Sequence, residues 1–105
     1  MWMTGLMTTF DYIIVGAGSA GCVLADKLSA NGRHSVLLIE AGPSDRRFWV
    51  QTPIGYGATY TDPKVNWRFY SEAEAGLGNR IMYMPRGKVL GGSSSINALV
   101  YHRGQ

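Results

Sequence analysis

The stretch Phe10–Glu40, FDYIIVGAGSAGCVLADKLSANGRHSVLLIE, decides the fold of this chain. Its first part, 10–15, is a short and nearly continuous apolar run, typical of a strand buried on both faces of a parallel sheet. The apolar residues of 19–31 recur with a helical period, and 35–39 is a second apolar run. Strand, helix and strand within about thirty residues predict a βαβ unit, whose right-handed crossover makes the strands parallel.

The helix of this unit is amphipathic. One of its faces collects four apolar residues, Ala20, Val23, Leu24 and Leu28. We expect this face to pack on the two strands. Gly32 follows the helix, and we expect it to end the helix in a left-handed conformation.

The first strand and the helix are joined by the loop Gly16-Ala17-Gly18-Ser19-Ala20-Gly21, which has G-x-G-x-x-G spacing. In such a loop Gly16 permits a tight turn, Gly18 lets a pyrophosphate approach the backbone, and Gly21 lets the helix pack closely. The helix N-terminus adds N–H donors and a partial positive charge. Glu40 ends the next strand, where a carboxylate accepts hydrogen bonds from ribose and disfavours a 2′-phosphate. The pattern predicts an adenine dinucleotide site, and it leaves FAD and NAD open.

Beyond Glu40 the regular pattern stops at a turn, 41–44, and we expect 45–66 to wind with at most a short helix. The runs 67–70 and 80–84 alternate like strands around a Gly- and Asn-containing turn at 76–79, which predicts a β-hairpin. A second glycine run follows, Gly91-Gly92-Ser93-Ser94-Ser95-Ile96-Asn97, with a helix expected to begin near Ser93. Its backbone N–H groups and hydroxyls are donors for an anion.

The stretch 86–98, RGKVLGGSSSINA, matches a G-[KR]-x-L-G-G-S-S-x-x-N signature, and with it the sequence resembles the glucose–methanol–choline (GMC) oxidoreductase family. The segments 11–16 and 40–42 and the pair Asn66-Trp67 also resemble that family, in its choline dehydrogenase-like and alcohol dehydrogenase-like branch. The resemblance covers residues 10 to 104. It implies an α/β fold, a Rossmann-like βαβ FAD-binding unit with an appended β-hairpin and loop segments, as part of an incomplete domain. It also implies a flavoenzyme that transfers hydride from a small-molecule alcohol, choline-like or another primary alcohol, to FAD.

The resemblance further implies which residues hold FAD. By this resemblance, the ADP half is bound by Gly16, Ala17, Gly18, Ser19, Ala20, Gly21, Glu40 and Ala41. The pyrophosphate is contacted by Gly91, Gly92 and Ser93, and the flavin ring by Asn97, Ala98, Leu99 and Val100. Ile96 stands where choline oxidases of the family carry the histidine that attaches FAD covalently, so we expect non-covalent FAD.

We assign no catalytic residue, because the catalytic histidine of the family lies near the C-terminus of much longer chains. His34 and His102 have no neighbour in sequence that would orient either as a base.

The domain organisation follows from the extent of the resemblance. We expect 1–9 to be a loose tail and 10–105 to be the N-terminal portion of an FAD-binding domain, without the substrate domain and inactive alone. The alternatives are a stand-alone or truncated dinucleotide-binding module without catalytic activity and a fragment of an NAD-linked dehydrogenase.

Composition argues against several other classes of protein. The net charge is +3, but the ten basic residues are scattered, which argues against a nucleic-acid surface. The single cysteine, Cys22, excludes an internal disulfide and fits a reducing compartment, and no ligand cluster suggests a metal. No stretch reaches the about 20 apolar residues of a membrane span. We expect a cytoplasmic protein, with membrane association of the full-length enzyme left open.

Overall fold

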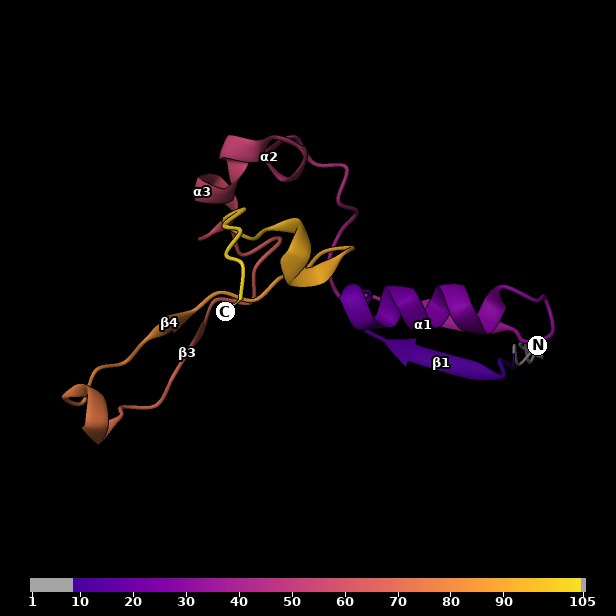
Figure 1. Cartoon of the computed structure of the whole chain (residues 1–105), viewed down its shortest axis with the longest axis horizontal. Helices are drawn as coiled ribbons and strands as arrows, with labels where there is room; N and C mark the ends of the chain where they lie inside the picture. Colours follow the sequence, from indigo (N-terminus) through magenta and orange to yellow (C-terminus); the bar gives the residue numbers. More distant parts are fainter. Residues whose placement is uncertain (1–8, 105) are drawn as a thin grey trace, which may run out of the picture.

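The computed structural model describes residues 9–104, so the predicted tail at 1–9 lies almost wholly outside the described residues, as does Gln105. The described chain forms short elements joined by loops (Figure 1). In chain order these are β1 (Tyr12–Val15), α1 (Ser19–Ser29), β2 (Val36–Ile39), α2 (Phe48–Gln51), the 3₁₀ helix η1 (Pro53–Gly55), α3 (Tyr56–Thr59), β3 (Phe69–Tyr70), η2 (Ala75–Leu77), β4 (Tyr83–Met84) and η3 (Gly92–Ser95).

The first three elements form the predicted parallel β1-α1-β2 unit. β1 pairs with β2 in parallel, with Tyr12 opposite Val36 and Val15 opposite Ile39. The helix ends at Ser29, and Gly32 turns the chain with a φ of 66°. Such a left-handed conformation costs glycine nothing, because it has no Cβ. The unit and its parallel pairing are therefore as predicted.

The burial of this unit differs from the prediction. The strands were expected to be buried on both faces, yet Ile13 is 60% exposed and Val15 is 83% exposed. A two-stranded sheet has two open edges, and within residues 9–104 only α1 covers one of its faces (Figure 1). The strands are apolar as expected, but no element among the described residues packs on the second face of the sheet.

The predicted packing face of α1 is only partly right, because Leu28 is half-buried but Val23 and Leu24 are not. Val23 and Leu24 are 58% and 51% exposed, whereas Gly21 is buried and Ala25 and Leu28 are half-buried. The helix therefore approaches the sheet through Gly21, Ala25 and Leu28. A Cβ at Gly21 would lie against the backbone of the preceding loop. Because α1 is apolar on two sides, its sequence period alone does not tell which side faces the strands.

The predicted hairpin is present. β3 and β4 are antiparallel, with Phe69 opposite Met84 and Tyr70 opposite Tyr83. The connection contains η2 and then Gly78 and Asn79, both with positive φ. The hairpin projects away from the β1-α1-β2 unit (Figure 1).

Two loop predictions were partly right. The winding segment 45–66 holds three single-turn helices, α2, η1 and α3, where at most one short helix was expected. The helix expected near Ser93 is only one 3₁₀ turn, η3, and the chain leaves the helical region at Ile96 with a φ of −129°. The hydroxyls of Ser94 and Ser95 in this turn bond to preceding carbonyl oxygens, an alternative to continued helix that serine offers.

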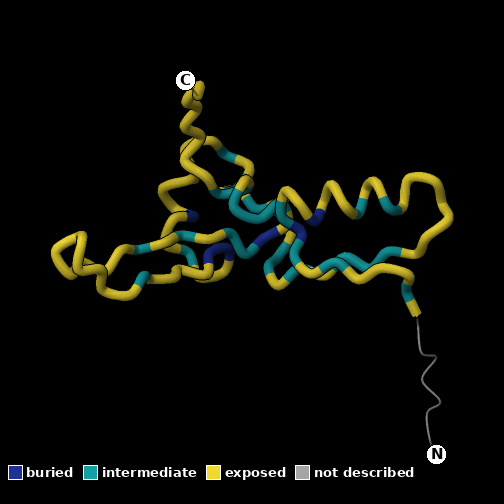
Figure 2. The backbone as a smooth tube through the Cα atoms, turned by 60° about the horizontal axis from the view of Figure 1, so that its bottom comes forward, coloured by how far each residue is buried: buried dark blue, intermediate teal, exposed yellow. Residues whose placement is uncertain are grey.

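The core lies between the parts rather than under the sheet. The radius of gyration is 18.2 Å, above the ~13 Å of a compact domain of this length. The buried residues lie in the middle of the described chain, and both ends of the tube are exposed (Figure 2). The buried side chains are those of Ala17, Thr59, Val65, Asn66 and Val89. Within 9–104, none of the helices is long and apolar enough to span a membrane.

Candidate functional site

The first glycine loop is shaped by its glycines. Gly16 leaves β1 with a φ of 98°, and Gly18 is the N-cap of α1 with extended backbone and no side-chain cap. A Cβ at Gly21 would overlap the Gly16 carbonyl oxygen, so the loop closes only with glycine at position 21. A Cβ at Gly18 would meet nothing within 4 Å. The surface above Gly18 is therefore open, and a ligand can approach the backbone there.

Glu40 anchors the same loop from the end of β2. Its Oε2 accepts a hydrogen bond from the Ala17 amide at 2.8 Å, and its Oε1 accepts one from the Gly42 amide at 2.9 Å. A carboxylate has about four acceptor positions, so each oxygen keeps one for another donor such as a ribose hydroxyl. Within the protein, Glu40 ties the glycine loop to the turn after β2.

The second glycine run lies directly on the first. The Gly91 amide donates to the Ala17 carbonyl oxygen at 2.8 Å. A Cβ at Gly92 would lie 2.9 Å from the Gly18 Cα, and Gly91 and Gly92 both have positive φ. The two backbones can approach this closely because Gly92 carries no side chain. Two segments that are 75 positions apart at Ser19 and Ser94 thus share one surface.

The serines of η3 differ in what their hydroxyl protons do. Ser94 donates to the Gly91 carbonyl oxygen at 2.6 Å, and Ser95 donates to the Leu90 carbonyl oxygen at 2.8 Å. The Ser93 oxygen instead accepts from the Gly87 amide at 2.9 Å, and it donates no hydrogen bond within residues 9–104. A hydroxyl has one donor and two acceptor positions. Ser93 is therefore the serine of this turn whose proton is free for an anion.

Residues 97–100 lie apart from the first loop. Asn97 donates to the Ser94 carbonyl oxygen at 3.2 Å and accepts from the Leu99 amide at 2.9 Å. Leu99 has a φ of 57°, and Val100 is 83% exposed. Along the described chain no hydrogen bond joins this segment to the loop 16–21. The structure thus brings together the residues predicted for the ADP half and the pyrophosphate, but not those predicted for the flavin ring.

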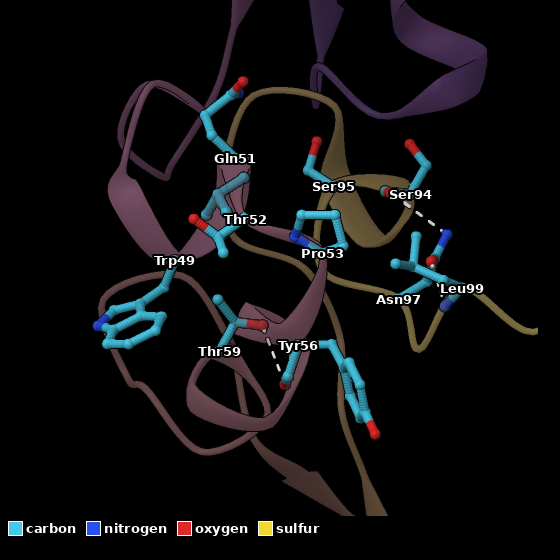
Figure 3. Close-up of a pocket in the computed structure, with 11 residues that line it drawn as sticks. Trp49, Gln51, Thr52, Pro53, Tyr56, Thr59, Ser94, Ser95, Asn97 and Leu99 are labelled. Carbon is cyan, nitrogen blue, oxygen red and sulfur yellow. Dashed lines mark hydrogen bonds between the residues drawn. The ribbon is translucent and has the colours of Figure 1, made fainter.

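Two cavities of about 220 Å³ each flank Asn97. In the first, residues of α2, η1 and α3 face Ser94, Ser95, Asn97 and Leu99 (Figure 3). The second is lined by Tyr60, Pro85, Arg86, Ser93, Ile96, Asn97 and Ala98. Ile96, singled out in the sequence, therefore faces a cavity next to Ser93.

The two histidines lie away from the glycine runs, whereas Cys22 bonds to the first loop. The His34 ring packs edge-on against Tyr12 at a centroid distance of 5.2 Å, and His102 is exposed. The Cys22 thiol donates to the Ala17 carbonyl oxygen at 3.3 Å. In the described part of the chain no three His, Cys, Asp or Glu side chains are grouped to hold a metal.

Sequence reasoning missed two contributors to this site. Asn66 is 1% exposed and bonds to the segment that leads into the second glycine run. A Cβ at Gly42 would overlap the Lys88 carbonyl oxygen, so Gly42 sets how closely that segment approaches β2. A signal was available for both, since Gly42 and Asn66 lie in stretches that resemble the family, 40–42 and Asn66-Trp67, but no role for either residue follows from the sequence alone.

Comparison with known proteins places these features in a family context. The family model for GMC oxidoreductase matches residues 10–105. The oxygen-dependent choline dehydrogenase of Photobacterium profundum is 59% identical over 97 residues, which are 92% of this chain and 17% of the relative. The crystal structure of pyridoxine 4-oxidase from Mesorbium loti matches with a TM-score of 0.81 and 38% identity, over 91% of this chain and 19% of that one. An FAD-dependent oxidoreductase from Chaetomium thermophilum matches with a TM-score of 0.70 and 37% identity, over 91% and 16%. The chain thus spans less than a fifth of the length of each of these proteins.

Proposed function

Because this chain belongs to the GMC oxidoreductase family, we propose that residues 10–105 form the N-terminal portion of the FAD-binding domain of an oxidoreductase acting on CH–OH donors. The observation that carries the proposal is the contact between the two glycine runs. Gly91 bonds to Ala17 and Gly92 packs on Gly18, so one diphosphate can reach both runs at once. A single ligand then accounts for both clusters.

The residues around this contact suit a diphosphate. The first turn of α1 holds no acidic residue, so its free N–H groups and partial positive charge face an anion unopposed. The open surface above Gly18 permits close approach, and the free proton of Ser93 adds a donor from the second run. The chain therefore binds the diphosphate through backbone N–H groups and one hydroxyl.

Glu40 is the proposed partner of the adenosine ribose. Its oxygens already accept two backbone N–H groups, and their remaining acceptor positions suit the 2′- and 3′-hydroxyls. A 2′-phosphate would bring negative charge against this carboxylate, which argues against NADP. Ala41 follows Glu40 and is exposed beside the same position.

Residues 97–100 are the proposed neighbours of the flavin ring. When bound, the flavin of FAD accepts a hydride from the alcohol carbon. The protein's task here is to hold the ring, and the exposed backbone after Asn97 is available for that contact. Ile96 offers no nucleophile to the ring, so the proposed attachment is non-covalent.

The substrate proposed for the whole protein is a small primary alcohol of the choline type. Choline and pyridoxine, named for the relatives above, both carry a primary alcohol. No residue of 9–104 is proposed as the catalytic base.

The test is the absorbance spectrum of the purified full-length protein, followed by anaerobic addition of choline and other primary alcohols. The proposal expects a yellow protein whose flavin bands bleach with an alcohol. A colourless protein that binds NADH would refute it in favour of a nicotinamide enzyme. A yellow protein that no alcohol reduces would keep the FAD site and refute the CH–OH reaction.

A further inference from the structure

The Asn66 side chain is buried and fully hydrogen-bonded. It is 1% exposed. Its Oδ1 accepts from the amides of Arg68 at 2.9 Å and Arg86 at 3.0 Å. Its Nδ2 donates to the carbonyl oxygens of Thr59 at 3.4 Å and Tyr60 at 2.8 Å. A primary amide has two acceptor and two donor positions, so all four are occupied and no other natural side chain of this size can replace them.

These bonds hold the segment that enters the second glycine run. Residues 65–67 pair with 86–88 through an isolated bridge between Asn66 and Gly87. The Trp67 amide donates to the Arg86 carbonyl oxygen at 2.8 Å, and the Lys88 amide donates to the Val65 carbonyl oxygen, also at 2.8 Å. The Asn66 side chain adds the bond to the Arg86 amide, which fixes the chain immediately before Gly87.

Gly87 in turn fixes Ser93. A Cβ at Gly87 would overlap the peptide between Gly92 and Ser93, so the two backbones are in direct contact. The Gly87 amide donates to the Ser93 oxygen at 2.9 Å. Because that oxygen accepts one N–H, its own proton points away from Gly87. The orientation of the Ser93 hydroxyl therefore depends on where Gly87 lies.

We propose that Asn66 is a positioning residue of the FAD site, acting through Arg86 and Gly87 to hold Ser93 and Gly92 where a diphosphate binds. The inference rests on the proposed function for its ligand. Asn66 itself touches no ligand, since its side chain is buried and all its polar positions bond to backbone. Its effect on binding is therefore carried by the hydroxyl of Ser93 and the backbone beside it.

The test compares three variants of the full-length protein after removal of FAD. Asn66→Leu has nearly the same size and removes all four hydrogen bonds, including the one to the Arg86 amide. Asn66→Asp keeps an acceptor oxygen toward Arg86 and loses the two donors. Tyr83→Phe is the matched control, because the Tyr83 hydroxyl donates to the same Tyr60 carbonyl oxygen but makes no contact with the glycine run.

The readout is the Kd for FAD, measured by quenching of flavin fluorescence. We expect Asn66→Leu to raise the Kd about five- to tenfold, the range for losing the one hydrogen bond, to the Arg86 amide, that acts on the glycine run. Asn66→Asp should raise it less, and Tyr83→Phe should leave it within about twofold, below the range of a lost hydrogen bond. In a Ser93→Ala background the effect of Asn66→Leu should shrink, because the group that it positions is gone. A Kd for Asn66→Leu equal to that of the wild type, or an effect fully additive with Ser93→Ala, would overturn the proposal.

Amide hydrogen exchange in the ligand-free proteins separates this proposal from the proposed function. Faster exchange at 86–95 in the Asn66 variants, with Tyr83→Phe unchanged there, would support the positioning role even if the wild type binds no FAD. Unchanged exchange at 86–95 would overturn it even if FAD binds. If Asn66→Leu does not fold, the same comparison is made with Asn66→Asp.

Discussion

Replacing Glu40 with glutamine separates two roles that one carboxylate can have. In the ligand-free structure both Glu40 oxygens accept backbone N–H groups, from Ala17 and Gly42. Either orientation of a glutamine amide therefore points an NH₂ group at one of these N–H donors. The variant loses one hydrogen bond to a charged acceptor and leaves a half-buried amide without its partner.

The magnitude follows from the lost bond. A hydrogen bond to a charged group contributes about 1.5–3 kcal/mol, so we expect Glu40→Gln to lower the free energy of unfolding by about 2 kcal/mol. The loss should appear in the apoprotein, because the bonds are internal. FAD affinity should fall as well, since the loop 16–21 is no longer tied to the turn after β2.

The assay is urea unfolding of full-length apoprotein, with Glu72→Gln as the control. Glu72 is exposed, and its carboxylate makes no hydrogen bond within the described residues, so its replacement should leave the midpoint unchanged. Equal midpoints for the wild type and Glu40→Gln apoproteins, with only FAD affinity reduced, would refute the anchoring role. The carboxylate would then serve the ligand alone.

Gly92→Ala should raise the Kd for FAD about tenfold or more, because its left-handed conformation costs a Cβ about 1–2 kcal/mol and that Cβ would also press on Gly18. An unchanged Kd in an FAD titration would contradict the contact between the runs. Acid precipitation of the full-length protein should release all flavin into the supernatant, since Ile96 offers no attachment, and flavin that stays in the pellet would disprove this. Hydrogen bonds from the backbone and side chain of Ser35 lower the pKa of Asp11 from its usual 3.8. The wild type should therefore be more stable than Asp11→Asn above pH 3.8, and this difference should be lost as the pH falls through the lower pKa of folded Asp11. Unfolding midpoints of both proteins, measured from pH 7 downward, would check this. A difference that persists undiminished at the lowest pH would refute it.

The local elements could be predicted from the sequence, because they depend on the spacing of apolar residues and on the positions of glycines. The β1-α1-β2 unit, the turn at Gly32 and the hairpin follow from patterns that span only a few residues. The G-x-G-x-x-G loop also follows, because its backbone requirements at Gly16 and Gly21 are local. These features could be predicted before any contact between distant segments was known.

Contacts between distant segments could not be predicted in this way. No local pattern shows that Gly92 packs on Gly18 or that Gly42 packs on Lys88. The side of α1 that faces the sheet also depended on a partner, because Val23 and Leu24 made a second apolar face. Asn66 has no role that its neighbours in sequence suggest, since its bonds go to residues brought near by the fold.

The most direct test of the central claim is a crystal structure of the full-length protein with FAD. We expect the diphosphate to lie between the two runs, with phosphate oxygens within hydrogen-bonding distance of the backbone N–H groups after Gly18 and of the Ser93 hydroxyl. A diphosphate bound to the first loop alone, with Ser93 bonded elsewhere, would contradict the claim that one ligand explains both glycine runs.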